Sequence, residues 1–292
     1  MDVLSHLLSL YPVRTALDTR CRGAVAWNME HVAQPYGTAP YHLVVQGGAV
    51  LLLDGRPPVQ LRSGDMLVLP RGQAHGLQIG AGVPDGTPTD ILCGQFHFGT
   101  AANGNLIGSL PDVMLVRTAD SNEFGGLQAL MHLLRDEAGA VQPGVTAVVS
   151  HLASALLALI LRAWLKQADT IPGLFALLAD QRLAPALQAM LTAPERDWSL
   201  EQFAQLCNMS RSTFLRAFRK AAGATPGDLL MRVRMAQAAQ WLKQAHRGVG
   251  DIGAAVGYQS EAAFNRAFKR HTGKGPGQYR RDGLYDGDAP LQ

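Results

Sequence analysis

The hydrophobic and polar positions follow two different periods along the chain. Up to about residue 115, apolar residues form short runs of strand length, separated by glycine- and proline-rich turns. Residues 43–53 predict a strand, a glycine turn and a second strand, and residues 66–70 and 91–98 predict further short strands. Closely spaced short strands of this kind are typical of a β-sandwich or a β-barrel.

From about residue 122 the apolar residues recur with the period of a helix. Two antiparallel helices between residues 122 and 168, joined near 139–144, explain this pattern best. Residues 170–173 break the pattern, and we expect only helices after them. An apolar stripe on the second helix has two open interpretations, a dimer face or a cover for the barrel, and it consists of Leu152, Leu156 and Leu159.

Length and composition predict a globular chain of two domains, with 292 residues of which 47% are hydrophobic and 17% are charged. The longest apolar run, residues 145–165, is interrupted by polar residues, so we do not expect a membrane span. The N-terminus lacks the basic and apolar segments of a secretion signal. Three cysteines are too few for a disulfide framework, which favours the reducing cytoplasm.

Charge is unevenly distributed along the chain. Residues 1–172 carry 10 Lys and Arg against 13 Asp and Glu, a net charge of −3, whereas residues 173–292 carry 16 against 10, a net charge of +6. The basic C-terminal part favours a polyanionic partner. A solvated basic face is the alternative explanation of the same count.

A segment of seventeen residues occurs twice in the C-terminal part. Residues 210–226 are SRSTFLRAFRKAAGATP, and residues 260–276 are SEAAFNRAFKRHTGKGP. The serines suit N-caps, the phenylalanines at i and i+4 share a core-facing side, and each glycine suits a left-handed C-cap with a proline behind it. With an offset of fifty, the matching positions are Ala204, Ser210, Phe214, Arg216, Ala217, Phe218, Gly223 and Pro226 with Ala254, Ser260, Phe264, Arg266, Ala267, Phe268, Gly273 and Pro276.

A short helix and a tight turn are predicted before each repeat. Residues 200–206 lead into the turn 207–209, and residues 251–256 lead into the turn 257–259. This order of a helix, a turn and a second helix, with a small alanine where the two helices cross, is the helix-turn-helix plan. The second helix of such a unit enters the DNA major groove. Residues 226–242 predict one long helix that holds the two units about one turn of DNA apart, roughly 34 Å. The alternative is a plain helical repeat in a scaffold protein.

Residues 180–281 resemble the DNA-binding domain of AraC/XylS-family transcription regulators. The matching text is LEQFA at 200–204, MSRSTFLRAFRK at 209–220, GATP at 223–226, RVRMAQA at 232–238, Ile252, VGY at 256–258, FNRAFK at 264–269 and PGQYR at 276–280. The resemblance implies base-facing positions in the two recognition helices, namely Ser212, Leu215 and Arg216 in the first and Glu261, Asn265 and Arg266 in the second. Phosphate contacts are expected from Arg211, Arg219, Lys269 and Arg270.

Residues 64–75 are GDMLVLPRGQAH, and they match the GxxxxxPxGxxH pattern of the cupin barrel. The pattern aims His75 into the barrel after a glycine-permitted turn. YHLVVQG at 41–47 resembles the first cupin strand pair, but the HxH and the glutamate that bind metal in cupins are absent there, and His42 stands alone. His42 and His75 are therefore expected to be structural or to contact an effector, with a metal site as the minor alternative.

The three cysteines are predicted to have different surroundings. Cys93 lies on a predicted strand, and an inward face would bring it near His42 or His75. Cys21 lies between two arginines, whose positive charges favour the reactive thiolate. Cys207 occupies the turn of the first helix-turn-helix unit, where a small buried residue is needed.

Residues 1–170 resemble the cupin-type sensor domain of AraC-family regulators, and most of all the reactive-chlorine-responsive activators. The likeness rests on MDVLS at 1–5, Cys21, Trp27, His42, Gln46 with Gly47, residues 64–75, and Cys93 with Gly94. In those activators two cysteines at the matching places are the oxidation switch, which the resemblance carries over to Cys21 and Cys93. A buried strand cysteine beside an incidental surface cysteine is the alternative, since a disulfide requires Cα atoms within about 7 Å.

These patterns together predict an α+β protein of two domains. A cupin-like β-barrel with a helical hairpin is expected at 1–170, an all-α DNA-binding domain with two helix-turn-helix units at 173–283, and a tail at 284–292. The expected function is that of a cytoplasmic, sequence-specific transcription activator that senses oxidants through Cys21 and Cys93. Expected partners are double-stranded promoter DNA and RNA polymerase, with a homodimer as an option, no membrane and no cofactor.

Two alternatives to oxidant sensing are open. The first is a DNA-binding regulator of the same kind that responds to a small organic effector in the barrel. The second is a cupin metalloenzyme with an appended helical domain, which requires a complete metal-ligand set that the sequence lacks.

Overall fold

The computed structural model describes residues 2–23, 27–79, 84, 88–98, 104–118, 122–171, 173–243 and 247–285. The chain forms two compact units that interleave along the sequence. The sheet unit contains residues 13–98 and 110–170, and the helical unit contains residues 1–12, 99–109 and 171–292.

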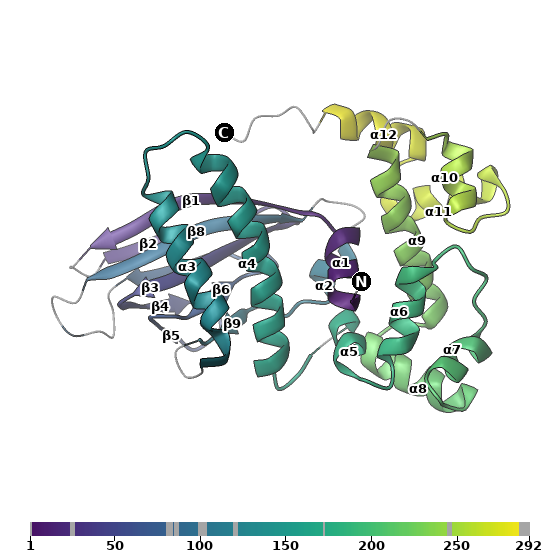
Figure 1. The fold of residues 1–292 in the computed structure, drawn as a ribbon, viewed down its shortest axis with the longest axis horizontal. Coiled ribbons are helices and arrows are strands. Elements are labelled where there is room, and N and C mark those ends of the chain that lie inside the picture. The colour runs from purple at the N-terminus through teal and green to yellow at the C-terminus, as the bar shows by residue number, and fades with distance from the viewer. Residues whose placement is uncertain are drawn as a thin grey trace. The chain divides into compact units, whose positions relative to one another are not determined.

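The sheet unit is built from two antiparallel sheets (Figure 1). One sheet has the strand order β1-β8-β3-β6-β9 and the other has the order β2-β7-β4-β5. The strands are β1 Val13–Gly23, β2 Trp27–His31, β3 Thr38–Gln46, β4 Gly48–Leu52, β5 Val59–Arg62, β6 Met66–Val68, β7 His75–Ile79, β8 Thr89–Phe98 and β9 Met114–Val116.

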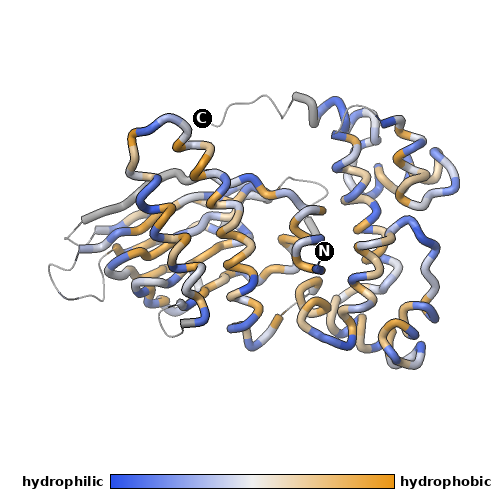
Figure 2. Tube along the Cα trace, in the orientation of Figure 1, coloured by the Kyte–Doolittle hydropathy of each residue, from blue (hydrophilic) through white to orange (hydrophobic). Residues whose placement is uncertain are grey.

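A buried apolar core lies between the two sheets, and Figure 2 shows hydrophobic positions following these strands. Leu51 and Leu77 enter the core from one sheet, and Leu67 and Ile91 enter it from the other. Gly47 makes the predicted turn between β3 and β4 with φ +75°, and a Cβ there would lie 2.3 Å from Oγ1 of Thr89. Only glycine meets both the left-handed backbone and the close approach.

The helical hairpin predicted after residue 122 is confirmed. A short 3-10 turn, Asn122–Phe124, leads into α3, Gly125–Ala138, and α4, Val145–Gln167, follows. Both helices pack on the sheet that contains β1, β3 and β9. Helix α4 is long and apolar enough to cross a membrane by length and composition alone. Its residue Leu156 is fully buried, as the barrel-covering interpretation of the leucine stripe expects.

The helical unit contains a helix from the N-terminus of the chain. Helix α1 begins with Asp2 as N-cap, and it packs on α6 and α9. Gln240 of α9 donates hydrogen bonds to the carbonyl oxygens of Ser9 and Leu10, at 2.5 and 2.7 Å. The helices are α1 Val3–Leu10, α2 Gly104–Gly108, α5 Gly173–Ala179, α6 Ala184–Thr192, α7 Leu200–Leu206, α8 Arg211–Ala222, α9 Pro226–Lys243, α10 Val249–Ala255, α11 Glu261–Thr272 and α12 Pro276–Tyr285.

Residues 99–109 also belong to the helical unit. Helix α2 packs on α5, and the Ser109 hydroxyl accepts a hydrogen bond from the backbone N–H of Leu174 at 3.2 Å. The predicted domains, 1–170 and 173–283, were continuous stretches, whereas the helical unit also contains two short segments, 1–12 and 99–109, of the predicted first domain. Of the predicted tail, residues 286–292 lie outside the part of the chain that the structure describes.

Candidate nucleic-acid interface and candidate sensor site

The caps predicted for the two recognition helices are confirmed. The Ser210 hydroxyl accepts a hydrogen bond from the backbone N–H of Thr213, and the Ser260 hydroxyl accepts one from Ala263, both at 3.3 Å. At the other ends, Gly223 and Gly273 have the left-handed φ values of 65° and 78°. These caps start and stop α8 and α11 at equivalent positions of the repeat.

Paired phenylalanines anchor each recognition helix. The rings of Phe214 and Phe218 lie 5.4 Å apart and those of Phe264 and Phe268 lie 5.6 Å apart, and all four are fully buried. Because these residues share one side of each helix, the opposite side is left for solvent or a ligand. The predicted connecting helix is also present as α9.

The offset of fifty holds for the recognition helices but not for the helices before them. The left-handed turn residue is Asn208 in the first unit, with φ 52°, and Gly257 in the second, with φ 88°. This is an offset of 49, so the small residue opposite Ala204 is Gly253 and not Ala254. Ala204 and Gly253 are buried, whereas Ala254 is exposed. The predicted match of Ala204 with Ala254 was wrong, because one extra residue follows the second turn.

Most of the predicted DNA-contacting side chains are exposed. Leu215 and Asn265 are half-buried, and the exposed ones are Arg211, Ser212, Arg216, Arg219, Glu261, Arg266, Lys269 and Arg270. Arg211 forms an ion pair with Glu201 of α7 at 2.9 Å. An exposed pair of this kind contributes about 1 kcal/mol at most, so it does not prevent Arg211 from contacting a phosphate.

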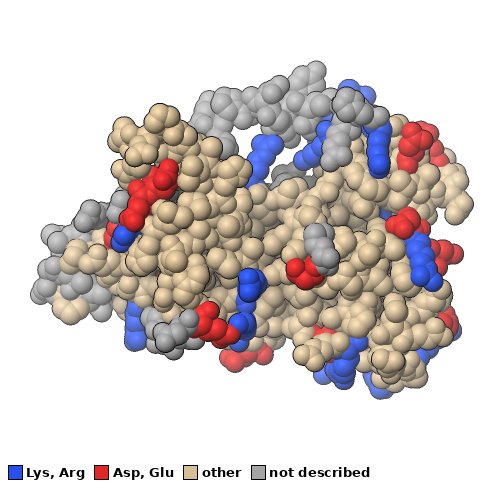
Figure 3. All heavy atoms as spheres, in the orientation of Figure 1, with Lys and Arg blue, Asp and Glu red and all other residues tan. Residues whose placement is uncertain are grey.

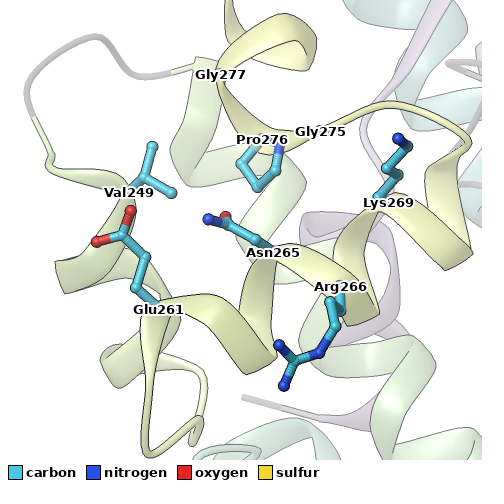
Figure 4. A pocket seen from close by; sticks show the side chains of 8 residues that line it. All are labelled: Val249, Glu261, Asn265, Arg266, Lys269, Gly275, Pro276 and Gly277. Carbon is cyan, nitrogen blue, oxygen red and sulfur yellow. The ribbon is translucent and has the colours of Figure 1, made fainter.

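A groove of about 480 Å³ runs along α11 (Figure 4). Glu261 and Asn265 extend into the groove toward Val249 and Pro276, and Arg266, which also lines the groove, extends from another side of the helix. The Oδ1 atom of Asn265 has no hydrogen-bond partner within the described part of the chain. This atom is almost inaccessible to solvent, so a DNA base can reach it only if the Asn265 side chain rotates.

Basic and acidic side chains are interspersed on the face of the molecule in Figure 3. The basic excess of residues 173–292 thus does not form one continuous patch on this face.

In the sheet unit, Cys93 and two histidines form a buried chain of contacts. Sγ of Cys93 lies 3.1 Å from Nδ1 of His42, and Nε2 of His42 lies 2.8 Å from Nε2 of His75. All three side chains are at most 4% exposed. The prediction that Cys93 faces inward, near His42 or His75, is confirmed.

The hydrogen-bond partners define the tautomers of His42 and His75. Nδ1 of His75 lies 2.9 Å from the carbonyl oxygen of Gln73, so Nδ1 must carry the proton and Nε2 accepts. His42 then donates from Nε2, and its Nδ1 accepts a hydrogen bond from the Cys93 thiol. Burial lowers the pKa of His42 well below its usual range and lowers the pKa of His75 to about 4, so both rings are neutral at pH 7.

A third histidine, His31, joins this group, and it was missed in the sequence. Its ring stacks on that of His75 with centroids 4.6 Å apart. One ligand atom from each of His31, His42 and His75 lies within 4.8 Å of the others, close enough to hold a metal ion. In β2 His31 shares a side with Trp27 and Met29, and the alternation of these residues with Asn28 and Glu30 is the local sequence signal that could have found it.

The other two cysteines, Cys21 and Cys207, lie in different units of the fold. Cys21 lies on β1 opposite Ile91 of β8, while Thr19 lies opposite Cys93. Its side chain lies outside the described residues. Cys207 is buried at the C-cap of α7, and burial raises the pKa of its thiol, as expected for a structural residue in the turn.

Comparisons with known proteins match both parts of the chain. Residues 2–166 match a family model described as "Cupin", and residues 203–282 match one described as "Helix-turn-helix domain". An uncharacterised HTH-type transcriptional regulator of Haemophilus influenzae is 34% identical, over 96% of this chain and 99% of its own length. The RCS-specific HTH-type transcriptional activator RclR of Escherichia coli is 32% identical, over 96% and 97%. Among solved structures, ToxT of Vibrio cholerae matches at 11% identity and a TM-score of 0.39, over 94% of this chain and 98% of its own.

Proposed function

The chain belongs to the AraC family of transcription regulators with a cupin domain, and from this premise we propose that it is an oxidant-responsive activator of specific promoters. Its relatives are named as regulators of transcription, and the chain is a DNA-binding regulator rather than an enzyme.

Two similar recognition helices support sequence-specific DNA binding. Each has a buried phenylalanine side and an exposed polar side, and α9 joins the two units with 18 residues, a rise of about 27 Å. On α11, the proposed base-facing residues are Asn265 and Arg266, because these side chains match adenine and guanine edges respectively. On α8, Leu215 suits a thymine methyl, whereas the Ser212 hydroxyl can hydrogen-bond to either kind of base edge.

Arg266 and Lys269 give a matched test of this assignment on the same helix. We expect Arg266→Ala to weaken binding to the specific operator by about 10–100-fold, since a bidentate arginine–guanine contact is worth about 1–3 kcal/mol. Lys269→Ala should weaken binding to all sequences alike and reduce the salt dependence by about one phosphate contact. Footprinting and salt titrations on the protein's own promoter region measure both. An unchanged Arg266→Ala footprint would show that α11 is placed wrongly on DNA.

The strand register is the observation that supports Cys21 and Cys93 as the oxidant sensor. Cys21 is opposite Ile91, and Cys93 is opposite Thr19, so the two cysteines are diagonal neighbours in the register of the β1–β8 pair. Diagonal Cα atoms lie about 7–8 Å apart, and a disulfide needs about 4.4–6.8 Å. A local shift of about 1–2 Å between the two strands therefore allows the bond.

The chemistry of the step is balanced with a hypochlorous acid oxidant. The first thiolate takes chlorine from the acid and becomes a sulfenyl chloride, with release of hydroxide. The thiol of the second cysteine then attacks this sulfur, forms the disulfide, expels chloride and passes its proton to the released hydroxide. Two electrons leave the thiols and reduce the oxidant's chlorine to chloride. The name of the E. coli relative, an RCS-specific activator, supports this class of signal.

The two strands that carry the cysteines also lead into the helical unit. β1 follows directly on residues 1–12, and β8 runs directly into residues 99–109, and both segments belong to that unit. Val13 and Phe98, the ends of the two strands, are paired with each other. A shift between β1 and β8 therefore acts on two chain connections to the DNA-binding helices at once.

Cysteine variants separate oxidant sensing from effector binding. We expect Cys21→Ser and Cys93→Ser each to abolish induction of a target promoter by hypochlorous acid, because either change leaves one thiol without its partner. Cys207→Ala, at a buried cysteine outside the strand pair, should retain induction. Reporter assays together with mass spectrometry of the two cysteine-containing peptides measure this. Full induction in the serine variants would favour a small organic effector in the barrel instead.

RNA polymerase and a second copy of the chain complete the proposed set of partners. An activator must contact the polymerase, which is an expectation from function alone. For the homodimer, exposed apolar residues on and beside the α3–α4 hairpin offer a face, namely Leu133, Val141 and Val148. Sedimentation of the full chain with and without Leu133→Glu would measure this association.

A further inference from the structure

The two helix-turn-helix units have a second connection besides the long helix α9. It is made by residues 194–199, which precede α7 and are called the entry loop below. A Cβ atom on Gly257, in the turn between α10 and α11, would lie 2.5 Å from the carbonyl oxygen of Glu195. The entry loop of the first helix-turn-helix unit therefore lies directly against the turn of the second one.

Trp198 attaches the entry loop to the core of the first helix-turn-helix unit. Its ring stacks on that of Phe203 of α7 with centroids 5.2 Å apart, and its Nε1–H donates to the carbonyl oxygen of Ala193 at 2.8 Å. Phe203 in turn stacks on Phe214 of α8 with centroids 6.2 Å apart. Stacked rings of this kind add to the burial that holds a core together, so the loop and the first recognition helix move as one body.

Arg234, in the middle of α9, joins the entry loop to the turn of the second helix-turn-helix unit. Its Nε donates to the carbonyl oxygen of Pro194 at 2.6 Å, and its Nη2 donates to that of Arg196 at 3.0 Å. The same Nη2 lies 3.0 Å from the position that a Cβ on Gly257 would occupy. A planar guanidinium with several fixed donors can hold two carbonyls at once, which the single ammonium of a lysine cannot do in the same geometry.

This second connection limits how the two recognition helices move relative to each other. Two bodies joined by one helix can still change their relative angle, because a long helix bends. A contact away from the axis of that helix removes this freedom. The contact between Glu195 and Gly257 is such a contact, and Arg234 holds the loop in place on one side of it.

We propose that Arg234 and the contact between the entry loop and Gly257 fix the distance and angle between α8 and α11, so that the protein accepts only one spacing between the two half-sites of its operator. This inference rests on the proposed binding of both recognition helices to one operator. Arg234 is a positioning residue in it, since the side chain acts through the two helix-turn-helix units and not on a base.

The spacing of the half-sites is sensitive to rigidity because DNA is a helix. Each base pair inserted between them moves the second half-site by about 3.4 Å along the axis and about 35° around it. A rigid pair of recognition helices then loses the base contacts of one helix, and the loss of one bidentate arginine–guanine pair alone costs about 10–100-fold in affinity. A pair that can change its angle follows the displaced half-site and loses less.

Binding of the full chain to operators with zero, one or two inserted base pairs tests the proposal. Footprinting on the protein's own promoter region first defines the two half-sites. We expect the wild type to bind about 10–100-fold more weakly after one insertion. Arg234→Met removes both hydrogen bonds, and Gly257→Ala places a methyl group against the Glu195 carbonyl. Each variant should therefore lower this affinity ratio by about tenfold.

Two control variants match these changes without touching the second connection. Lys243→Met also removes one positive charge from α9, at an exposed position. Gly273→Ala also adds a Cβ at a left-handed glycine, with φ +78°, but nothing lies within 4 Å of it. Both controls should keep the affinity ratio of the wild type.

The ratio also separates positioning from a loss of stability. Partial unfolding lowers the affinity for all operators by the same factor and leaves their ratio unchanged. The proposal would be overturned by a wild type that protects both half-sites equally well at every spacing, or by a wild-type ratio in both Arg234→Met and Gly257→Ala. Protection of only one half-site by the wild type would instead contradict the proposed binding through both recognition helices.

Discussion

Replacing Leu7 with Ala should destabilise the DNA-binding helices, although Leu7 is about two hundred residues away from them in the sequence. Leu7 is fully buried, and its helix α1 packs on α6 and α9. Truncating a buried leucine costs about 2–5 kcal/mol, because apolar contacts are lost and a cavity remains. Hydrogen exchange of the full chain should then show faster exchange in α6 and α9, while β3 and β8 keep their protection.

Ser9→Ala is the matched control on the same helix. The Ser9 side chain is exposed, and the carbonyl that accepts from Gln240 belongs to the backbone, which the substitution leaves in place. Its effect should stay within about 0.5 kcal/mol. If Leu7→Ala left exchange in α6 and α9 unchanged, α1 would be an independent arm rather than a part of the helical unit. DNA affinity of both variants shows whether this loss of stability reaches the recognition helices.

Gly253→Leu should disrupt the second helix-turn-helix unit. A Cβ at position 253 would lie 3.0 Å from Cβ and Cγ of Phe264, so a leucine would push the buried ring of α11 out of place. Overpacking of this kind costs about 1–3 kcal/mol, and more when the neighbour cannot move, and Phe264 is in contact with Tyr258 and Phe268. Operator affinity and hydrogen exchange of α10 and α11 measure the loss.

Ala254→Leu separates the two possible alignments of the repeat. Ala254 is exposed, so its replacement should change stability by no more than about 0.5 kcal/mol. An offset of fifty throughout would predict the opposite order, with position 254 at the helix crossing. Greater damage from Ala254→Leu than from Gly253→Leu would therefore show that the register of α10 is different from the one described.

Helix pairs, caps and the family could be predicted from the sequence because their signals are local. The phenylalanines of α8 and α11 repeat at i and i+4, and the capping serine and glycine lie within a turn of the helix that they close. The same holds for the α3–α4 hairpin, whose apolar period persists over many residues. Such features depend on interactions between residues less than about five positions apart.

The candidate sensor site could be predicted only in part. The cupin-like pattern identified His42 and His75, and the strand alternation around Cys93 brought it near them. His31 was missed because the expected cupin pattern is HxH, with two histidines separated by one residue. In this protein the third histidine, His31, lies on β2, which pairs with β7, the strand of His75. Register across strands sets this proximity, and register is not visible in a single segment.

By itself, the sequence determined the element types, the doubled helix-turn-helix plan and the membership of a regulator family, because hydrophobic period, caps and turn residues act over short distances. Tertiary structure alone decided that α1 and residues 99–109 join the DNA-binding helices, that Cys21 and Cys93 are diagonal neighbours, and that Gly253 occupies the helix crossing. These outcomes depend on packing and backbone hydrogen bonds between segments tens to hundreds of residues apart. No local pattern encodes them, since each segment satisfies its own preferences equally well with other partners.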